Sequence, residues 1–292
     1  MRLPSAGKGT TTAGLVAYYN SNSQLSDRNN AAPVAQSLHT RLLPFIESVN
    51  VHNLFEDLDR SYNIASVTTT TNNNSTTEQV SNLAAAQSRI EAFICPTIGG
   101  PRGSAEGDTS TSSEGNLSFG FTDYAPVIAV DDLLYGGSSF GVRNISVFNG
   151  RSGRRMGSVT DGTSNTIGIA ETTGRDTNMN ASGTIGDSSS SQQCVSDLGP
   201  ADQEVNGGAQ WRWVDPANAF VVSARINSVA NDEAAWFVNN AGPNGEAFSF
   251  HTGGANFVYV DGSTHFISDS VAAELFGNTC SSSGGEVNVV DQ

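Results

Sequence analysis

Two residues near the C-terminus are the first whose types suggest chemistry. In the segment "FSFHTGGANFVYVDGSTHFIS", residues 248–268, nine residues separate His251 from the pair Asp261-Gly262. A histidine within hydrogen-bond reach of a carboxylate can act as a general base. Whether these two side chains meet depends on the elements that carry them.

The pair Asp261-Gly262 predicts a hairpin with a two-residue turn, in which both central residues take positive φ. Aromatic and polar residues alternate on either side of it, which is typical of strands with one buried face. A second loop, residues 252–255, extends the hairpin to a three-stranded meander with an aromatic face. The predicted pairs are Val260–Ser263, Tyr259–Thr264, Val258–His265, Phe257–Phe266, His251–Asn256 and Phe250–Phe257.

In this meander His251 and Asp261 occupy opposite ends of one strand, roughly 15 Å apart at about 3.3 Å per residue. They are too distant to share a proton. We therefore expect His251 to cap the Gly253-Gly254 loop or to make an assembly contact. Its partner is expected outside its own hairpin.

Other catalytic patterns are weak. The segment "SAGKGTTT" resembles a phosphate-binding loop, but Arg2 stands where that loop requires its first glycine. No H-E-x-x-H or comparable histidine spacing is present to hold a metal ion. The sequence thus predicts a protein that is not an enzyme and that has no organic cofactor.

Calcium is the one cofactor that the sequence leaves open. Asp161 in "DGTSNT" and Asp261 in "DGSTHF" each precede small hydroxyl residues, which supply the oxygen ligands that calcium prefers. Neither segment has the residue order of an EF-hand. Ordinary use of Asp-Gly in a turn is the more common reading for both.

The three cysteines are too few for a disulfide-dense scaffold. Cys194 and Cys280 stand in Ser-rich stretches that look like surface loops, and we predict a disulfide between them. Cys95 ends the apolar run "IEAFIC", so we expect a short buried strand there with Cys95 as a small hydrophobic residue.

Charge and hydropathy limit the partners. The formal net charge is −15, and Lys8 is the only lysine, so no basic face exists to bind nucleic acid. No run of 18 apolar residues is present to span a membrane. Asn-x-Ser/Thr triplets, which arise by chance in such a chain or mark glycosylation, occur among others at Asn74, Asn116, Asn144 and Asn180.

The elements that carry these residues indicate an α+β, β-rich fold with long polar loops. Apolar residues recur at a helical period between residues 42 and 58, with Pro44 in the first turn. Strands are predicted in "TDYAPVIAVDD" and in the run from residue 167 to 170. We predict an N-terminal tail over residues 1–38, with the end of a helix at 13–20, and one globular domain over 39–292.

Four ordered blocks resemble a known family. They are "RLLPFIE" at 41–47, "FICP" at 93–96, "VTDGTSNTIGIAE" at 159–171 and the C-terminal pattern of His251, nine residues, and Asp261-Gly262. The chain resembles bacterial prepilin-like proteins of unassigned biochemical function, whose C-terminal domain is named for this H-X9-DG signature. Its family-motif residues here are His251, Gly253, Gly254, Asp261 and Gly262.

The resemblance implies a pilin-like architecture, with an N-terminal helix packed on an antiparallel sheet, and a place outside the cell or on its surface. It implies a structural subunit whose partners are copies of itself in a filament or surface layer. Only "AGLVAYYN" resembles the end of the N-terminal helical stem of that family. The alternative is a secreted or cell-surface module that binds a solute or carbohydrate, with Trp211, Trp213 and Trp236 as stacking residues, although alternating Trp on one strand is more often core.

Overall fold

The computed structural model describes residues 3, 36–56, 58, 67–71, 74–78, 82–97, 105–106, 118–136, 142–148, 154–173, 212–214, 218–222, 224–227 and 247–285 of the 292-residue chain. The predicted helix end at 13–20 lies outside these residues. Within the described residues, no helix combines the length and the apolar character needed to cross a membrane.

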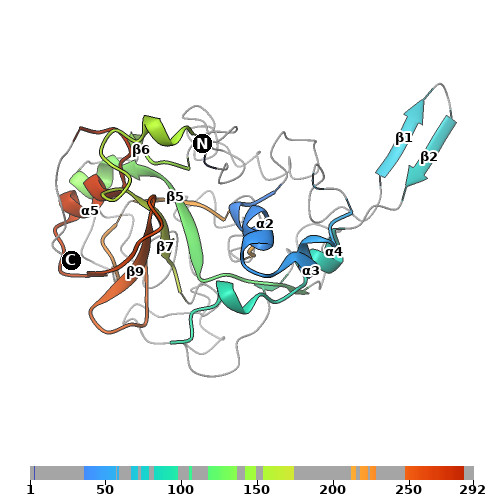
Figure 1. The fold of residues 1–292 in the computed structure, drawn as a ribbon, viewed down its shortest axis with the longest axis horizontal. Coiled ribbons are helices and arrows are strands. Elements are labelled where there is room, and N and C mark those ends of the chain that lie inside the picture. Colours follow the sequence, from blue (N-terminus) through green and yellow to red (C-terminus); the bar gives the residue numbers. More distant parts are fainter. Residues whose placement is uncertain are drawn as a thin grey trace.

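A six-stranded sheet forms the centre of the described structure (Figure 1). Its order is β10-β9-β7-β5-β6, with β8 joined to β5 in parallel and all other neighbours antiparallel. This confirms the α+β, β-rich class and the strands predicted at β5 and β7. The strands are β5 (Tyr124–Asp131), β6 (Val142–Ile145), β7 (Ile167–Glu171), β8 (Phe220–Val222), β9 (Gly254–Tyr259) and β10 (Thr264–Ser268).

Short helices and two small ribbons surround this sheet. The helix α5 packs on it through Phe276, whose ring centroid lies 5.5 Å from that of Phe257 on β9. The ribbon of β1 (Val67–Thr71) and β2 (Asn74–Glu78) projects beyond α4 (Figure 1). The remaining elements are α2 (Leu38–Leu42), η3 (Leu43–Phe45), α3 (Val49–His52), α4 (Leu83–Ala86), η4 (Glu91–Phe93), β3 (Ala105–Glu106), β4 (Ser118–Phe119), η5 (Asp132–Tyr135), η6 (Met156–Ser158) and α5 (Ala273–Cys280).

A second apolar cluster lies beside the short helices. Trp213 is fully buried among residues of η3, α3, α4 and η4, and its indole Nε1 donates to the Ser88 carbonyl at 2.8 Å. The helical period predicted over 42–58 does not produce one continuous helix: the range holds the end of α2, then η3, then α3. Pro44 lies in the first turn of η3 between them, where the missing N–H cannot continue α2.

The predicted register of the β9–β10 hairpin is wrong by one residue. The Gly262 N–H donates to Tyr259 O at 2.9 Å and the Tyr259 N–H to Ser263 O at 2.8 Å, so the loop has three residues, with Gly262 at φ +91°. Thr264 therefore pairs with Val258, where Tyr259 was expected. Because a slip of one residue exchanges the two faces, Phe266 leaves the aromatic face and is 48% exposed.

Two further strand predictions are wrong. Residues 248–251 do not pair with β9 but lie beside the end of β7, where Phe248 bridges Thr172 in parallel. The run "IEAFIC" forms η4 instead of a strand. Its apolar residues Ile90, Phe93 and Cys95 are all buried. In a strand, Ile90 would point to the face opposite to that of Phe93 and Cys95.

Candidate functional site

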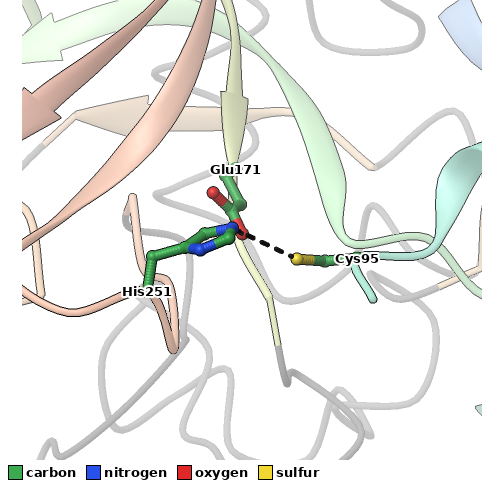
Figure 2. A group of neighbouring side chains, drawn as sticks. All are labelled: Cys95, Glu171 and His251. Carbon is green, nitrogen blue, oxygen red and sulfur yellow. Dashed lines mark hydrogen bonds and ion pairs between the residues drawn. The ribbon is translucent and has the colours of Figure 1, made fainter. Parts of the chain in front are cut away.

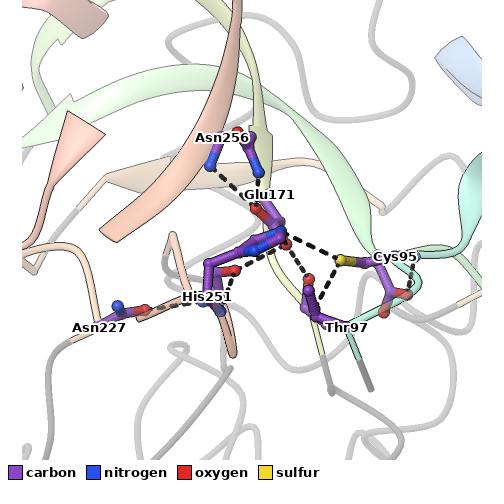
Figure 3. Close-up of polar contacts among 9 residues, drawn as sticks. Cys95, Thr97, Glu171, Asn227, His251 and Asn256 are labelled. Atoms are coloured by element: carbon purple, nitrogen blue, oxygen red, sulfur yellow. Dashed lines mark hydrogen bonds and ion pairs between the residues drawn. The ribbon is translucent and has the colours of Figure 1, made fainter. Parts of the chain in front are cut away.

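A buried glutamate at the end of β7 connects three segments of the chain. Glu171 is fully buried, and its Oε1 accepts hydrogen bonds from the hydroxyls of Thr173 and Ser249, both at 2.8 Å. Its Oε2 accepts from the backbone N–H of Asn256 at 2.9 Å and from the Asn256 amide at 3.0 Å. The donors come from the residues just after β7, from the segment before β9 and from β9 itself, and Figure 3 shows Asn256 of β9 directed at the Glu171 carboxylate.

The hydrogen bonds determine the charge of this carboxylate. Burial raises the pKa of Glu171, but the hydrogen bonds donated by Cys95, Asn256, Ser249 and Thr173 outweigh it, and the pKa is lowered from its ordinary value. A buried carboxylate with this many donors stays ionised at neutral pH. It is therefore a fixed negative charge inside the protein.

Cys95 and His251 complete a cluster around Glu171 (Figure 2). Nε2 of His251 lies 3.7 Å from Oε1 of Glu171 and 3.8 Å from Sγ of Cys95. Cys95 follows η4 and is held by its backbone N–H, which donates to Asp123 Oδ2 at 2.7 Å. Burial raises the pKa of the Cys95 thiol, with the nearby Glu171 charge acting in the same direction and hydrogen bonds from Thr97 opposing it.

His251 is the only member of the cluster with substantial contact with solvent, since its side chain is 32% exposed and that of Glu171 is fully buried. Its backbone N–H donates to Ser249 Oγ at 3.1 Å, and its ring lies edge-on to Phe266 at 6.3 Å between centroids. Its carboxylate neighbour is thus on β7, which confirms that the partner lies outside the hairpin.

The arrangement does not fit a nucleophilic cysteine. In a Cys–His–acid relay the cysteine and the acid contact opposite nitrogens of the imidazole. One nitrogen accepts the proton of the thiol, and the acid holds the other nitrogen and so orients the ring. Here both Cys95 and Glu171 approach the same atom, Nε2 of His251. The thiol with its raised pKa is also a poor source of thiolate.

Of the two aspartates predicted as calcium ligands, Asp261 acts within its own turn and Asp161 binds a distant segment. Asp261 Oδ1 accepts from the backbone N–H and hydroxyl of Ser263 at 2.8 and 2.6 Å, which lowers the pKa of Asp261. The carboxylate of Asp161 accepts from the backbone N–H groups of Gly284 and Gly285 at 2.8 and 3.1 Å. Calcium binding by either residue stays a prediction.

The cysteine predictions have mixed outcomes. Cys95 is buried as expected, but its contacts with Glu171 and His251 were not foreseen. Cys280 was expected in a surface loop and instead ends α5, where it is a fully buried free thiol. The disulfide was predicted because both cysteines were expected in surface loops, and the buried position of Cys280 contradicts that expectation. Cys194 lies outside the described residues.

The other predicted site residues that the structure describes are not members of this cluster. Trp213 is core, as alternation predicted, and is not available to stack on a carbohydrate. Asn74 lies in β2 and the half-buried Asn144 in β6. Trp211, Trp236, Asn116 and Asn180 lie outside the described residues.

Sequence reasoning missed Glu171 and the role of Cys95, although a signal for both was present. Cys95 is the third residue of the block "FICP", Glu171 ends "VTDGTSNTIGIAE", and His251 begins the C-terminal signature. Three of the four blocks therefore each supply one member of the cluster. Each block by itself indicates only a strand or a turn.

Comparison with known proteins gives one match. Residues 15–274 match the model of a family described as a protein of unknown function, DUF1559. Searches of curated proteins and of solved structures find no significant match. Because the matched range covers most of the 292 residues, the chain belongs to the DUF1559 family of proteins of unknown function.

Proposed function

We propose that this protein is a non-enzymatic, prepilin-like structural subunit that assembles with copies of itself outside the cell or on its surface. The observation that carries the proposal is a group of exposed apolar side chains in one short segment. Phe45, Val49, Leu54 and Leu58 are 83%, 53%, 45% and 40% exposed. Large apolar side chains grouped in this way mark protein interfaces more often than single exposed ones do.

The apolar segment is held rigidly enough to act as an interface. Leu43 and Val51, in the same segment, are buried in the cluster around Trp213. They anchor η3 and α3 while Phe45 and Val49 point away from that cluster. A second copy of the chain is the occupant that we assign to this surface, because the resemblance to prepilin-like proteins implies self-assembly.

The β1–β2 ribbon supports the same proposal. In the part of the chain that the structure describes it consists of two strands, rich in threonine, and it projects beyond α4 (Figure 1). A two-stranded ribbon alone is only marginally stable in water, and each open edge can accept a strand from another chain. Pairing with a neighbouring subunit would stabilise it.

The roles of the signature residues also favour a structural protein. Gly262 supplies the positive φ of the turn, and a side chain at Gly254 would collide with the carbonyl oxygen of Ile267 across the hairpin. Asp261 caps the turn through Ser263. These residues shape the hairpin and its contact with β7.

The test is self-association of the full chain, measured by light scattering after size exclusion over a range of concentrations and by electron microscopy. We expect concentration-dependent assembly, and we expect F45S/V49S to weaken it at least about tenfold, since tenfold corresponds to about 1.4 kcal/mol. The matched control is F266S, which removes an exposed phenylalanine from β10. A strictly monomeric wild-type chain, or equal loss in F266S, would contradict the proposal.

A further inference from the structure

We infer that Cys95, Glu171 and His251 form a binding site for one divalent transition-metal ion, with Zn²⁺ as the best match. The ligand atoms are Sγ of Cys95, Oε1 of Glu171 and Nε2 of His251 (Figure 2). Among the described residues this is the group of cysteine, histidine and acidic side chains whose ligand atoms all lie within 4.8 Å of one another. The inference does not depend on self-assembly.

The distances fit a tetrahedral zinc site. Bonds of about 2.3 Å to sulfur and about 2.0–2.2 Å to nitrogen or oxygen place neighbouring ligand atoms roughly 3.3–3.6 Å apart. The Sγ–Nε2 and Nε2–Oε1 distances here are 3.8 and 3.7 Å. Small side-chain rotations therefore close the three atoms around an ion without movement of the strands.

The donor set selects among metals. Thiolate and imidazole are the ligands that zinc and its neighbours in the first transition row prefer, whereas magnesium and calcium require oxygen ligands. On binding, the Cys95 thiol releases its proton to solvent and becomes a thiolate. The thiolate and the Glu171 carboxylate then balance the charge of a divalent cation in this buried place.

The carboxylate already has the outer contacts of a metal ligand. Asn256 holds Oε2 with two hydrogen bonds, which orient the carboxylate and leave Oε1 directed at Nε2 of His251 (Figure 3). Ser249 and Thr173 donate to Oε1 itself. An ion at Oε1 replaces one of these bonds, because a hydroxyl group can rotate to another acceptor. Such outer contacts accompany most metal-ligating carboxylates.

The cluster also has an entry path. Cys95 and Glu171 are buried, but His251 is partly exposed, so an ion can enter past its ring. Three protein ligands leave one position of a tetrahedral set for a water molecule.

The experiment uses the full chain after removal of metals with a chelator. Zn²⁺ is titrated by calorimetry, and Co²⁺ serves as a spectroscopic probe because a thiolate ligand produces a charge-transfer absorption. We expect one ion per chain and this absorption. C95S should abolish the absorption, and both C95S and H251Q should weaken Zn²⁺ binding by more than the 10–100-fold that loss of an outer contact typically costs.

Two controls separate this site from other ligands on the chain. H265Q removes a histidine of β10 that lies outside the cluster, and C194S removes the cysteine that is neither Cys95 nor Cys280; both should bind as the wild type does. Circular dichroism confirms that each variant is folded, and H251Q, at the partly exposed position, decides the case if C95S does not fold. Absence of stoichiometric binding, or binding that C95S and H251Q leave unchanged, would overturn the inference.

Discussion

At the scale of single residues, Glu171 is a fully buried carboxylate held by several hydrogen bonds. A buried carboxylate loses its hydration and is tolerated only when donors replace it. Thr173, Ser249 and Asn256 provide four hydrogen bonds from three parts of the chain. The residue therefore holds the segment before β9 against the end of β7, whether or not an ion is bound.

This role predicts that Glu171→Gln destabilises the protein by about 2–3 kcal/mol, since an amide NH₂ would face donors that have lost their acceptor. The measurement is urea unfolding in the presence of a chelator. The control is Glu91→Gln, which removes an exposed carboxylate paired with Arg89 at 2.7 Å and should leave the urea midpoint nearly unchanged, because solvent screens an exposed ion pair. Similar losses of stability in the two variants would contradict a structural role for the hydrogen bonds of Glu171.

Tyr259 predicts a loss of stability at alkaline pH. Burial, with the nearby Cys280 and Asp261 acting in the same direction, raises the pKa of Tyr259 to about 12, above about 10 in an unfolded chain. The folded state thus favours the neutral phenol, and its contribution is complete below about pH 10 and lost as pH rises towards 12. Tyr259→Phe should flatten the fall of the urea midpoint between about pH 10 and 12.

Part of that fall should remain in the Tyr259→Phe variant, because burial also raises the pKa of Tyr124. The double variant with Tyr124→Phe should flatten the profile further. A profile that neither substitution changes would show that other groups cause the alkaline loss.

At the scale of elements, the β9–β10 hairpin shows how one residue in a turn decides a face of the sheet. The three-residue loop needs a left-handed residue at its last position, and Gly262 at φ +91° provides it. The resulting register places Phe257 and Ile267 in the core and Phe266 outside. A two-residue turn would have exchanged these positions.

We predict that Gly262→Ala destabilises the protein by about 1–2 kcal/mol, the cost of placing a Cβ in the left-handed region. Gly157→Ala is the matched control, because Gly157 lies in η6 with open space around it and no left-handed φ. It should be neutral or slightly stabilising in thermal or urea unfolding. Equal effects at the two sites would contradict the proposed turn.

Several elements could be predicted from the sequence and others could not. The runs that became β5 and β7 carry their apolar pattern locally, and most of β5 is buried, as its composition indicates. The run "IEAFIC" has the same apolar character, yet it forms η4. Ile90 and Phe93 pack in the cluster around Trp213, and the buried Cys95 lies beside Glu171 and His251. An apolar composition indicates that a segment is buried, but it does not show whether the buried side chains follow the period of a helix or of a strand.

At the scale of the whole molecule, Cys280 reports on the integrity of the core. It is a fully buried free thiol at the end of α5, packed in the cluster beneath the sheet. Burial raises its pKa, so little thiolate forms at neutral pH. Its reaction with an alkylating reagent therefore requires α5 to leave the sheet.

We predict that Cys280 is not alkylated in the native protein and is alkylated at once after denaturation without reductant. Peptide mass spectrometry after labelling in increasing urea should give a labelling midpoint that matches global unfolding. Rapid native labelling would show that α5 opens independently. If labelling requires a reductant, Cys280 is in a disulfide, as the sequence predicted.

The sequence by itself determined the β-rich class, two central strands, the presence of the C-terminal hairpin and the acidic net charge. These features follow from local composition and periodicity. Only the tertiary structure decided the register of the hairpin and the burial of Cys280, and only it brought Cys95, Glu171 and His251 within 4.8 Å. Those three residues are far apart in the chain, and their meeting depends on long-range packing between β7, η4 and the segment before β9, which no local pattern encodes.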